Sequence, residues 1–221
     1  MRIKKIFLSL LISLMFVIPS ICLSASVELW ELFPIDRGAN YAYPLAYRVE
    51  TGTLRLLDKL GDYSFGTPEN YSWWNIPYIS RGDYPWIITH PKGWEIGDGS
   101  YTEATILALV VPQNVSSGDR ITGTVEARGG GYISFKIGTL FQGILYETNV
   151  GYSPVNFDLL THINAGDIVW FGVFPNGYSY DDTTYYKTTI FYTPIPAPPT
   201  IILMITGVGA FIFLRKKIKR E

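Results

Sequence analysis

Alternating apolar and polar residues between positions 103 and 192 constrain the fold of this 221-residue chain more than any other feature. From Ile121 to Arg128, odd positions are apolar or glycine, and even positions are threonine or charged. Side chains along a β-strand point to alternate faces, so a period of two predicts a strand with one buried face. This pattern, or a short apolar run, predicts strands at 103–112, 119–128, 131–138, 139–148, 155–163, 168–175 and 183–192.

Short strands at this spacing, separated by turn residues, predict an all-β fold with a single antiparallel β-sandwich or jelly-roll domain over residues 27–193. Earlier strands are expected in WIITH (86–90) and within residues 41–57. The best helical pattern is LRLLDKL, in the range Tyr47–Leu60, although Thr51-Gly52 interrupts that range. We therefore expect strands to dominate the domain.

Two stretches of the sequence resemble a known family of domains. They are GDGSYTEATILALVVPQNVSSGDRITGTVEA and NFDLLTHINAGDIVWFGVFPNGYSYDDTTYYKTTI. An apolar strand that ends in proline, a Gly-Asp turn that opens another apolar strand, and an Asp-Thr pair before the last strand resemble the carbohydrate-binding-like β-jelly rolls of secreted bacterial proteins. The resemblance covers residues 86–192 and implies the fold, but this fold hosts many roles, so function has to be argued from a site.

The N-terminus has the order of a secretory signal peptide. Basic residues Arg2, Lys4 and Lys5 precede an apolar stretch from Ile6 to Ile18, and small residues follow at 24–26. This order predicts a signal peptide over residues 1–26. The alternative, an uncleaved anchor, is disfavoured because the apolar stretch of 13 residues falls short of the roughly 20 that a spanning helix needs.

Only one cysteine, Cys22, is present, and it lies within the predicted signal peptide. After cleavage near Ala25–Ser26 the mature chain has no thiol, which excludes disulfides and cysteine-bound metals. Export without disulfides is compatible with a bacterial envelope or exterior.

The C-terminus, residues 194–221, combines prolines, a short apolar run and basic residues. Ile201–Leu214 would form a helix of about 21 Å, which is shorter than the roughly 30 Å hydrocarbon core of a bilayer. The basic residues that follow are Arg215, Lys216, Lys217, Lys219 and Arg220. The positive-inside rule keeps them cytoplasmic, which places the domain across the membrane. The tail therefore predicts a sorting signal with a transient span.

This tail resembles that of the PEP-CTERM family of Gram-negative bacteria, which exosortases process and which is often linked to exopolysaccharide. The resemblance implies an exosortase-type membrane protease as partner, transient contact with the inner membrane, and a final location at the cell surface or outside the cell. The motif residues are Pro194, Ile195, Pro196, Ala197, Pro198 and Pro199. Ile195 stands where the family typically has glutamate, so a retained anchor facing the periplasm stays as the alternative.

Charge argues against nucleic acid as a partner. Of the 18 basic and 19 acidic residues, 3 basic ones lie in the signal peptide, and 5 basic ones with Glu221 lie in the tail. The domain keeps 10 basic and 18 acidic residues, a net charge of −8. An acidic domain repels phosphate backbones.

No catalytic motif is recognisable, so we expect a non-enzyme. The two histidines, His90 and His162, are predicted to be surface or turn residues. Asp181 and Asp182 are expected in a turn before the last strand, with calcium as the one metal they suggest. A secreted glycan hydrolase or lyase stays as an alternative, and Asp83 would join Asp181 and Asp182 as its candidate carboxylates.

Aromatic residues suggest the ligand. Trp73 and Trp74 lie in the Tyr- and Pro-rich segment NYSWWNIPYISRGDYPW, and Tyr178 and Tyr180 lie in a predicted loop. Sugars stack their C–H faces on such rings, whereas Trp170, inside an apolar strand, is expected in the core. The sequence thus predicts an exported, non-enzymatic surface or matrix protein that binds exopolysaccharide. A purely structural, membrane-anchored envelope protein is the remaining alternative.

Overall fold

The computed structural model describes residues 25–67, 77–92, 102–111, 115–128, 132–176 and 183–194. Residues Ser24–Thr193 group as one compact unit, which forms the β domain. Several residues singled out above lie outside the described ranges: Trp73, Trp74, Tyr178, Tyr180, Asp181, Asp182 and the tail beyond Pro194.

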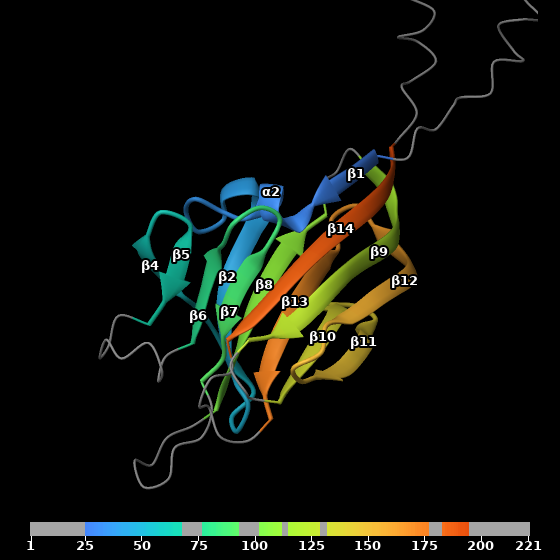
Figure 1. Ribbon diagram of the computed structural model, residues 1–221. Helices are drawn as coiled ribbons and strands as arrows, with labels where there is room; N and C mark the ends of the chain where they lie inside the picture. The colour runs from blue at the N-terminus through green and yellow to red at the C-terminus, as the bar shows by residue number, and fades with distance from the viewer. Residues whose placement is uncertain are drawn as a thin grey trace, which may run out of the picture. The chain divides into compact units, whose positions relative to one another are not determined.

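Two antiparallel sheets make up the described chain (Figure 1). Sheet A has the order β12 (Val155–Asn164), β9 (Val115–Ala127), β14 (Thr184–Pro194), β7 (Ile87–His90), β6 (Tyr78–Arg81), β5 (Ser64–Gly66) and β4 (Asp58–Gly61), with β1 (Ala25–Glu28) paired to β14. Sheet B has the order β11 (Gly143–Val150), β10 (Ile133–Thr139), β13 (Ile168–Pro175), β8 (Glu103–Val110), β2 (Ala42–Arg48) and β3 (Thr53–Leu56).

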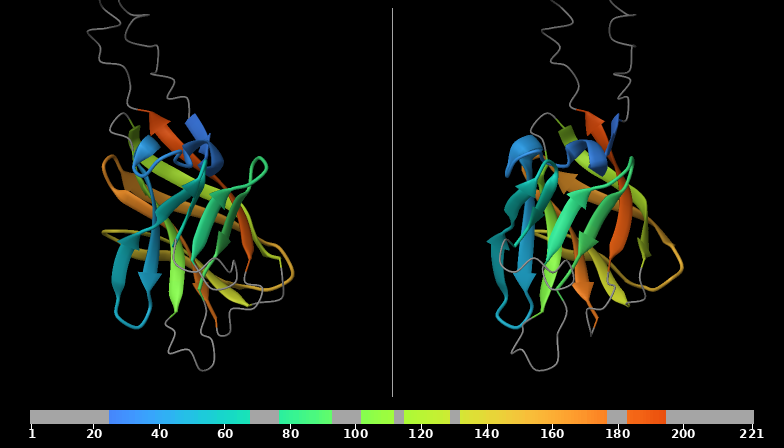
Figure 2. Two further views of the ribbon diagram at one scale, coloured as in Figure 1. Left: turned by 90° about the vertical axis from the view of Figure 1, so that its left-hand side faces the viewer. Right: turned by 60° about the vertical axis from the view of Figure 1, so that its left-hand side comes forward.

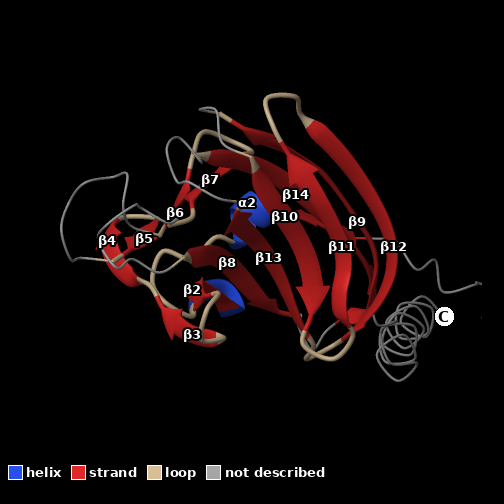
Figure 3. Ribbon diagram, turned by 90° about the horizontal axis from the view of Figure 1, so that it is seen from below, coloured by secondary structure: helices blue, strands red, loops and turns tan. Residues whose placement is uncertain are grey.

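The strand order from β7 onward is that of a jelly roll. Apart from the β10–β11 hairpin within sheet B, successive strands cross between the sheets, which gives β7-β14-β9-β12 in sheet A and β8-β13-β10-β11 in sheet B. The sheets lie face to face as two curved layers (Figure 3). The predicted all-β jelly roll is confirmed, and β1 to β6 extend it.

The core lies between the two sheets and follows the period of two. On β9, Ile121 and Val125 are fully buried, whereas Thr122 and Thr124 face outward. A short helix, α2 (Leu29–Leu32), and a 3-10 turn, η1 (Ala39–Tyr41), precede the second strand. Leu29 belongs to the core cluster, which fixes the start of the chain to the sandwich.

Two sequence expectations were wrong. The predicted helix within 47–60 is instead the end of β2, a turn, β3 and most of β4, because pairing with β2 outweighs a weak local helical preference. The predicted strand 139–148 begins only at Gly143, since residues 140–142 form the hairpin turn and Gly143 has a φ of +75°.

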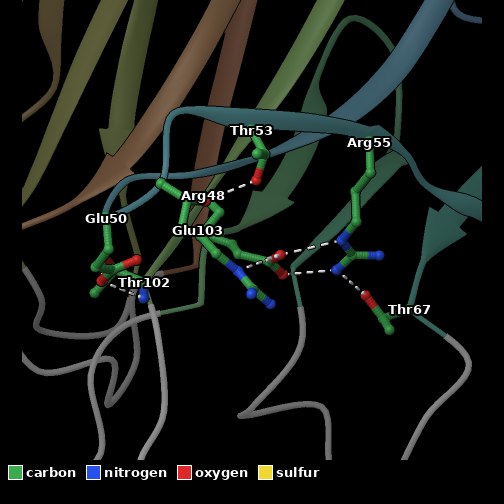
Figure 4. Close-up of polar contacts among 8 residues, drawn as sticks. Arg48, Glu50, Thr53, Arg55, Thr67, Thr102 and Glu103 are labelled. Atoms are coloured by element: carbon green, nitrogen blue, oxygen red, sulfur yellow. Dashed lines mark hydrogen bonds and ion pairs between the residues drawn. The ribbon is translucent and has the colours of Figure 1, made fainter.

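A buried carboxylate anchors strand β3 to β8 (Figure 4). Glu103 is 1% exposed and accepts hydrogen bonds from Arg55 Nε at 3.0 Å and Arg55 Nη2 at 2.6 Å. Arg48 Nε lies 4.0 Å from the same carboxylate. Two-point contacts between arginine and carboxylate are directional. This cluster therefore holds the edge strand β3, which carries Leu54, in a defined position beside β2.

Candidate binding groove

The outer face of sheet B carries a large apolar groove. Its volume is about 670 Å³, and its lining comes from β2, β3, β8, β10, β11 and β13. The β2–β3 hairpin lies next to β8 (Figure 2), and Val49 and Leu54 of this hairpin line the groove. The lining residues are Tyr43, Leu45, Tyr47, Val49, Leu54, Ile106, Ala108, Val110, Lys136, Leu140, Ile144, Ile168, Trp170 and Phe174.

Trp170 contributes the largest aromatic ring of the described groove lining, which is called the platform below. Its register partner on β10 is Gly138, where an added Cβ would lie 2.3 Å from Trp170 Cζ2. At Gly172, an added Cβ would lie 3.3 Å from Trp170 Cζ3. The indole therefore lies close to two glycines, and at Gly138 the distance leaves no room for a Cβ atom unless the ring shifts. Trp170 is partly exposed and lines the groove, so part of its side chain is accessible there.

Two further rings extend the platform. Phe174 Cε2 lies 2.7 Å from the position of an added Cβ at Gly172. The Tyr47 ring meets Phe174 edge to face, with centroids 6.0 Å apart. Ile106 and Ala108 form the floor between the strands, and each is 7% exposed. The groove thus offers a broad surface of rings and methyl groups.

The polar groups of the described lining are the Lys136 ammonium and the phenols of Tyr43 and Tyr47. Lys136 Nζ lies 4.9 Å from the Phe174 centroid and 2.8 Å from Glu147 Oε1, so it bridges the platform and the rim. The hydrogen bonds that Lys136 and Ser134 donate lower the pKa of the Glu147 carboxyl. The Lys136 ammonium can only donate hydrogen bonds, whereas the two phenols can donate or accept them.

A second, polar groove of about 450 Å³ lies on the outer face of sheet A. Its hydroxyl, amide and carboxylate groups are largely engaged with one another: Thr124 Oγ1 donates to Asn156 Oδ1 at 2.8 Å, and Thr189 Oγ1 donates to Glu28 Oε1 at 2.8 Å. No Trp or Tyr occurs among the described residues that line it. The aromatic platform therefore distinguishes the groove on sheet B.

The structure places some predicted residues away from either groove. Asp83 is an exposed residue of the turn between β6 and β7. His162 is exposed on β12, as predicted, whereas His90 is 5% exposed at the end of β7, so its predicted surface position was wrong. Pro194 is the last residue of β14.

Within the described ranges, no group of three or more His, Cys, Asp or Glu side chains is arranged to hold a metal ion. The suggested calcium ligands Asp181 and Asp182 lie outside those ranges. None of the described helices has the length and apolar character required to cross a membrane.

The expectation that Trp170 lies in the core was wrong. It shares its parity on β13 with Ile168 and Phe174, which face outward, whereas Val169, Phe171 and Val173 face inward. Both faces of β13 are apolar, so hydrophobicity alone does not separate them. The usable signal in the sequence was Gly172, on the same face as Trp170, because a glycine next to a large ring leaves room for the ring.

Comparison with known proteins gives only distant likenesses. No family model and no curated protein matches the chain. Among solved structures, a family 29 carbohydrate-binding module matches with TM-score 0.36 and 11% identity, over 69% of this chain and 90% of that one. The family 51 module from Clostridium perfringens, solved with methyl-galactose, matches with TM-score 0.36 and 13% identity, over 75% of this chain and 99% of that one.

A family two carbohydrate esterase from Cellvibrio japonicus matches with TM-score 0.36 and 10% identity, over 80% of this chain and 36% of the esterase. This chain therefore spans well under half of that enzyme. Likenesses at this level assign no function, which has to come from the groove itself.

Proposed function

We propose that this protein is an exported, non-enzymatic surface or extracellular-matrix protein that binds polysaccharide in the groove on sheet B. The observation that carries the proposal is the indole of Trp170, which lies close to Gly138 and Gly172 in the lining of the groove. A sugar ring presents a flat C–H face, and such a face stacks on an exposed aromatic ring whose own position is fixed. Phe174 and Tyr47 continue the surface to more than one sugar unit.

Of the carboxylates named for the hydrolase alternative, the structure describes only Asp83, in the turn between β6 and β7, and a different carboxylate pair lies in the groove on sheet A. Glu28 and Asp158 line the groove on sheet A together. A glycosidase needs one carboxyl with a raised pKa as its general acid. The hydrogen bonds from Arg120 instead lower the pKa of Asp158, and Glu28 accepts a hydrogen bond from Thr189. These hydrogen bonds support a structural role for the carboxylates of Glu28 and Asp158.

Binding is tested with the mature protein, residues 26–193, on an array of bacterial and plant polysaccharides, followed by isothermal titration with the best polymer. We expect saturable binding that competes with soluble oligosaccharides of the same polymer. Because stacking on flat rings needs no net charge, the binding should persist at about 0.5 M salt, where surface charges are screened within roughly 5 Å. Failure to bind any polymer on the array would refute the proposal.

The sorting part of the proposal rests on the two ends of the chain. β14 ends at Pro194, the first residue of the proline motif, and the register pairs Ala25 with Tyr192. A signal-peptide cut near Ala25–Ser26 would remove at most the outermost pairing between β1 and β14. A tail cut beyond Pro194 would leave β14 whole. Processing at both ends is thus compatible with a complete sandwich.

Mass spectrometry of the mature protein from its native host is expected to show loss of the residues beyond about Pro194–Thr200. The basic cluster and apolar run would then be absent, as exosortase-type processing requires. Deleting the basic residues 215–220 should leave the tail uncut and reduce the amount of protein at the surface. A mature chain that still ends at Glu221 would instead establish a retained anchor.

A further inference from the structure

The chemistry of the groove on sheet B narrows the kind of polysaccharide it can take. Apart from Lys136, Tyr43 and Tyr47, the described lining is aliphatic or aromatic. An unmodified sugar carries a hydroxyl on most of its ring carbons, and each hydroxyl is both a donor and an acceptor. A hydroxyl that loses its water partners against aliphatic side chains is costly. A fully hydroxylated glycan therefore fits this lining poorly.

An acetyl ester changes that balance. It replaces the hydroxyl proton with a methyl group, which gains from apolar contact, and a carbonyl oxygen, which only accepts hydrogen bonds. The ammonium of Lys136 and the phenols of Tyr43 and Tyr47 can donate to such a carbonyl. The lining thus offers apolar side chains for the acetyl methyl group and hydrogen-bond donors for the ester carbonyl, so it is complementary to an acetylated sugar.

Ala108 is the smallest side chain of the described lining and is 7% exposed, so it leaves the most room for a methyl group. Ala108 is the register partner of Tyr43 on β2 and of Trp170 on β13, so a small side chain lies between two rings on the same face. Next to it, Ile106 adds a branched apolar wall. The indole extends from β13 over Gly138 on β10, so a substituent on the β8 side of a stacked sugar would reach across about one strand spacing, roughly 5 Å, to Ala108.

We propose that the groove selects O-acetylated polysaccharide, with the sugar ring on Trp170 and the acetyl methyl over Ala108. This inference rests on the proposed polysaccharide binding in the same groove. The donors at the groove then hold the ester carbonyl, and the aliphatic rim at Val49, Leu54, Leu140 and Ile144 covers the chain of sugars.

The test compares one polymer in two states: a glucomannan that carries O-acetyl groups, and the same preparation after mild alkali has removed them. Isothermal titration of the mature protein is expected to show binding to the acetylated polymer at least about tenfold tighter than to the de-esterified one. The variant Ala108→Leu fills the room at this position and should bring the two affinities together. Leu160→Ala, on the outer face of sheet A, is the matched control and should keep the preference.

The outcomes separate the two proposals. Equal affinity of the wild type for both polymers, or tighter binding of the de-esterified one, overturns the acetyl selectivity but keeps polysaccharide binding. Absence of binding to both polymers and to the wider array overturns both proposals. If Ala108→Leu folds, as its circular dichroism will report, and keeps the tenfold preference, Ala108 is not at the acetyl site; if it does not fold, the two-polymer comparison decides.

Discussion

The variant Trp170→Ala is expected to bind polysaccharide about 30-fold more weakly than the wild type. This corresponds to roughly 2 kcal/mol, the loss typical of removing a central aromatic anchor from a binding surface. The indole lies close to Gly138 and Gly172, so its removal takes away the platform and exposes bare backbone. Affinity is measured by isothermal titration on protein whose folded state has been checked by circular dichroism.

Matched variants distinguish the platform from general damage. Trp170→Phe keeps a smaller ring and should lose only part of the affinity. Leu160→Ala removes a large side chain that is 86% exposed on the opposite sheet and should bind as the wild type does. If Trp73→Ala or Trp74→Ala abolishes binding while Trp170→Ala does not, the predicted loop site carries the contact and the groove does not.

The second large effect is on stability. Gly123→Ala is expected to lower the free energy of unfolding by about 3 kcal/mol, the upper end of the range for added atoms in a filled core. An added Cβ would lie 2.1 Å from the backbone oxygen of Lys187 and 2.5 Å from Phe157 Cζ. The phenyl ring can turn, but the carbonyl belongs to β14 and cannot move without shifting that strand.

Urea denaturation followed by tryptophan fluorescence measures this loss. Gly61→Ala is the control, because it is also a glycine of sheet A and an added Cβ there meets nothing within 4 Å. Its effect should stay within about 0.5 kcal/mol. Equal midpoints for Gly123→Ala and the wild type would mean that β9 and β14 are not in the close contact that the structure shows.

Much of the fold could be predicted because the strands from residue 103 onward show an alternation of apolar and polar residues, or an apolar run, within their own sequence. On β9, the alternation from Ile121 to Arg128 predicted one buried face, and Ile121 and Val125 on that face are fully buried. The first half of the chain was harder. Strands β4, β5 and β6 are only three or four residues long, and a pattern of that length does not distinguish a strand from a turn.

The candidate site was harder to predict from the sequence than the fold was. The aromatic residues proposed from sequence, Trp73, Trp74, Tyr178 and Tyr180, were chosen because loops expose their side chains. Trp170 was assigned to the core because its strand is apolar at nearly every position. A strand of that kind has two apolar faces, and the sequence does not say which face meets the other sheet and which one lines a groove.

The sequence by itself determined the all-β class and the period of the later strands, and it carries the predicted export and sorting signals at the two ends, because each is written in consecutive residues. Only the tertiary structure decided where the groove lies. Gly138 comes next to Trp170, and Ala108 between Tyr43 and Trp170, through strand pairings that join segments 32 to 65 positions apart in the chain. Such neighbours are set by register across the sheet, which no local pattern encodes.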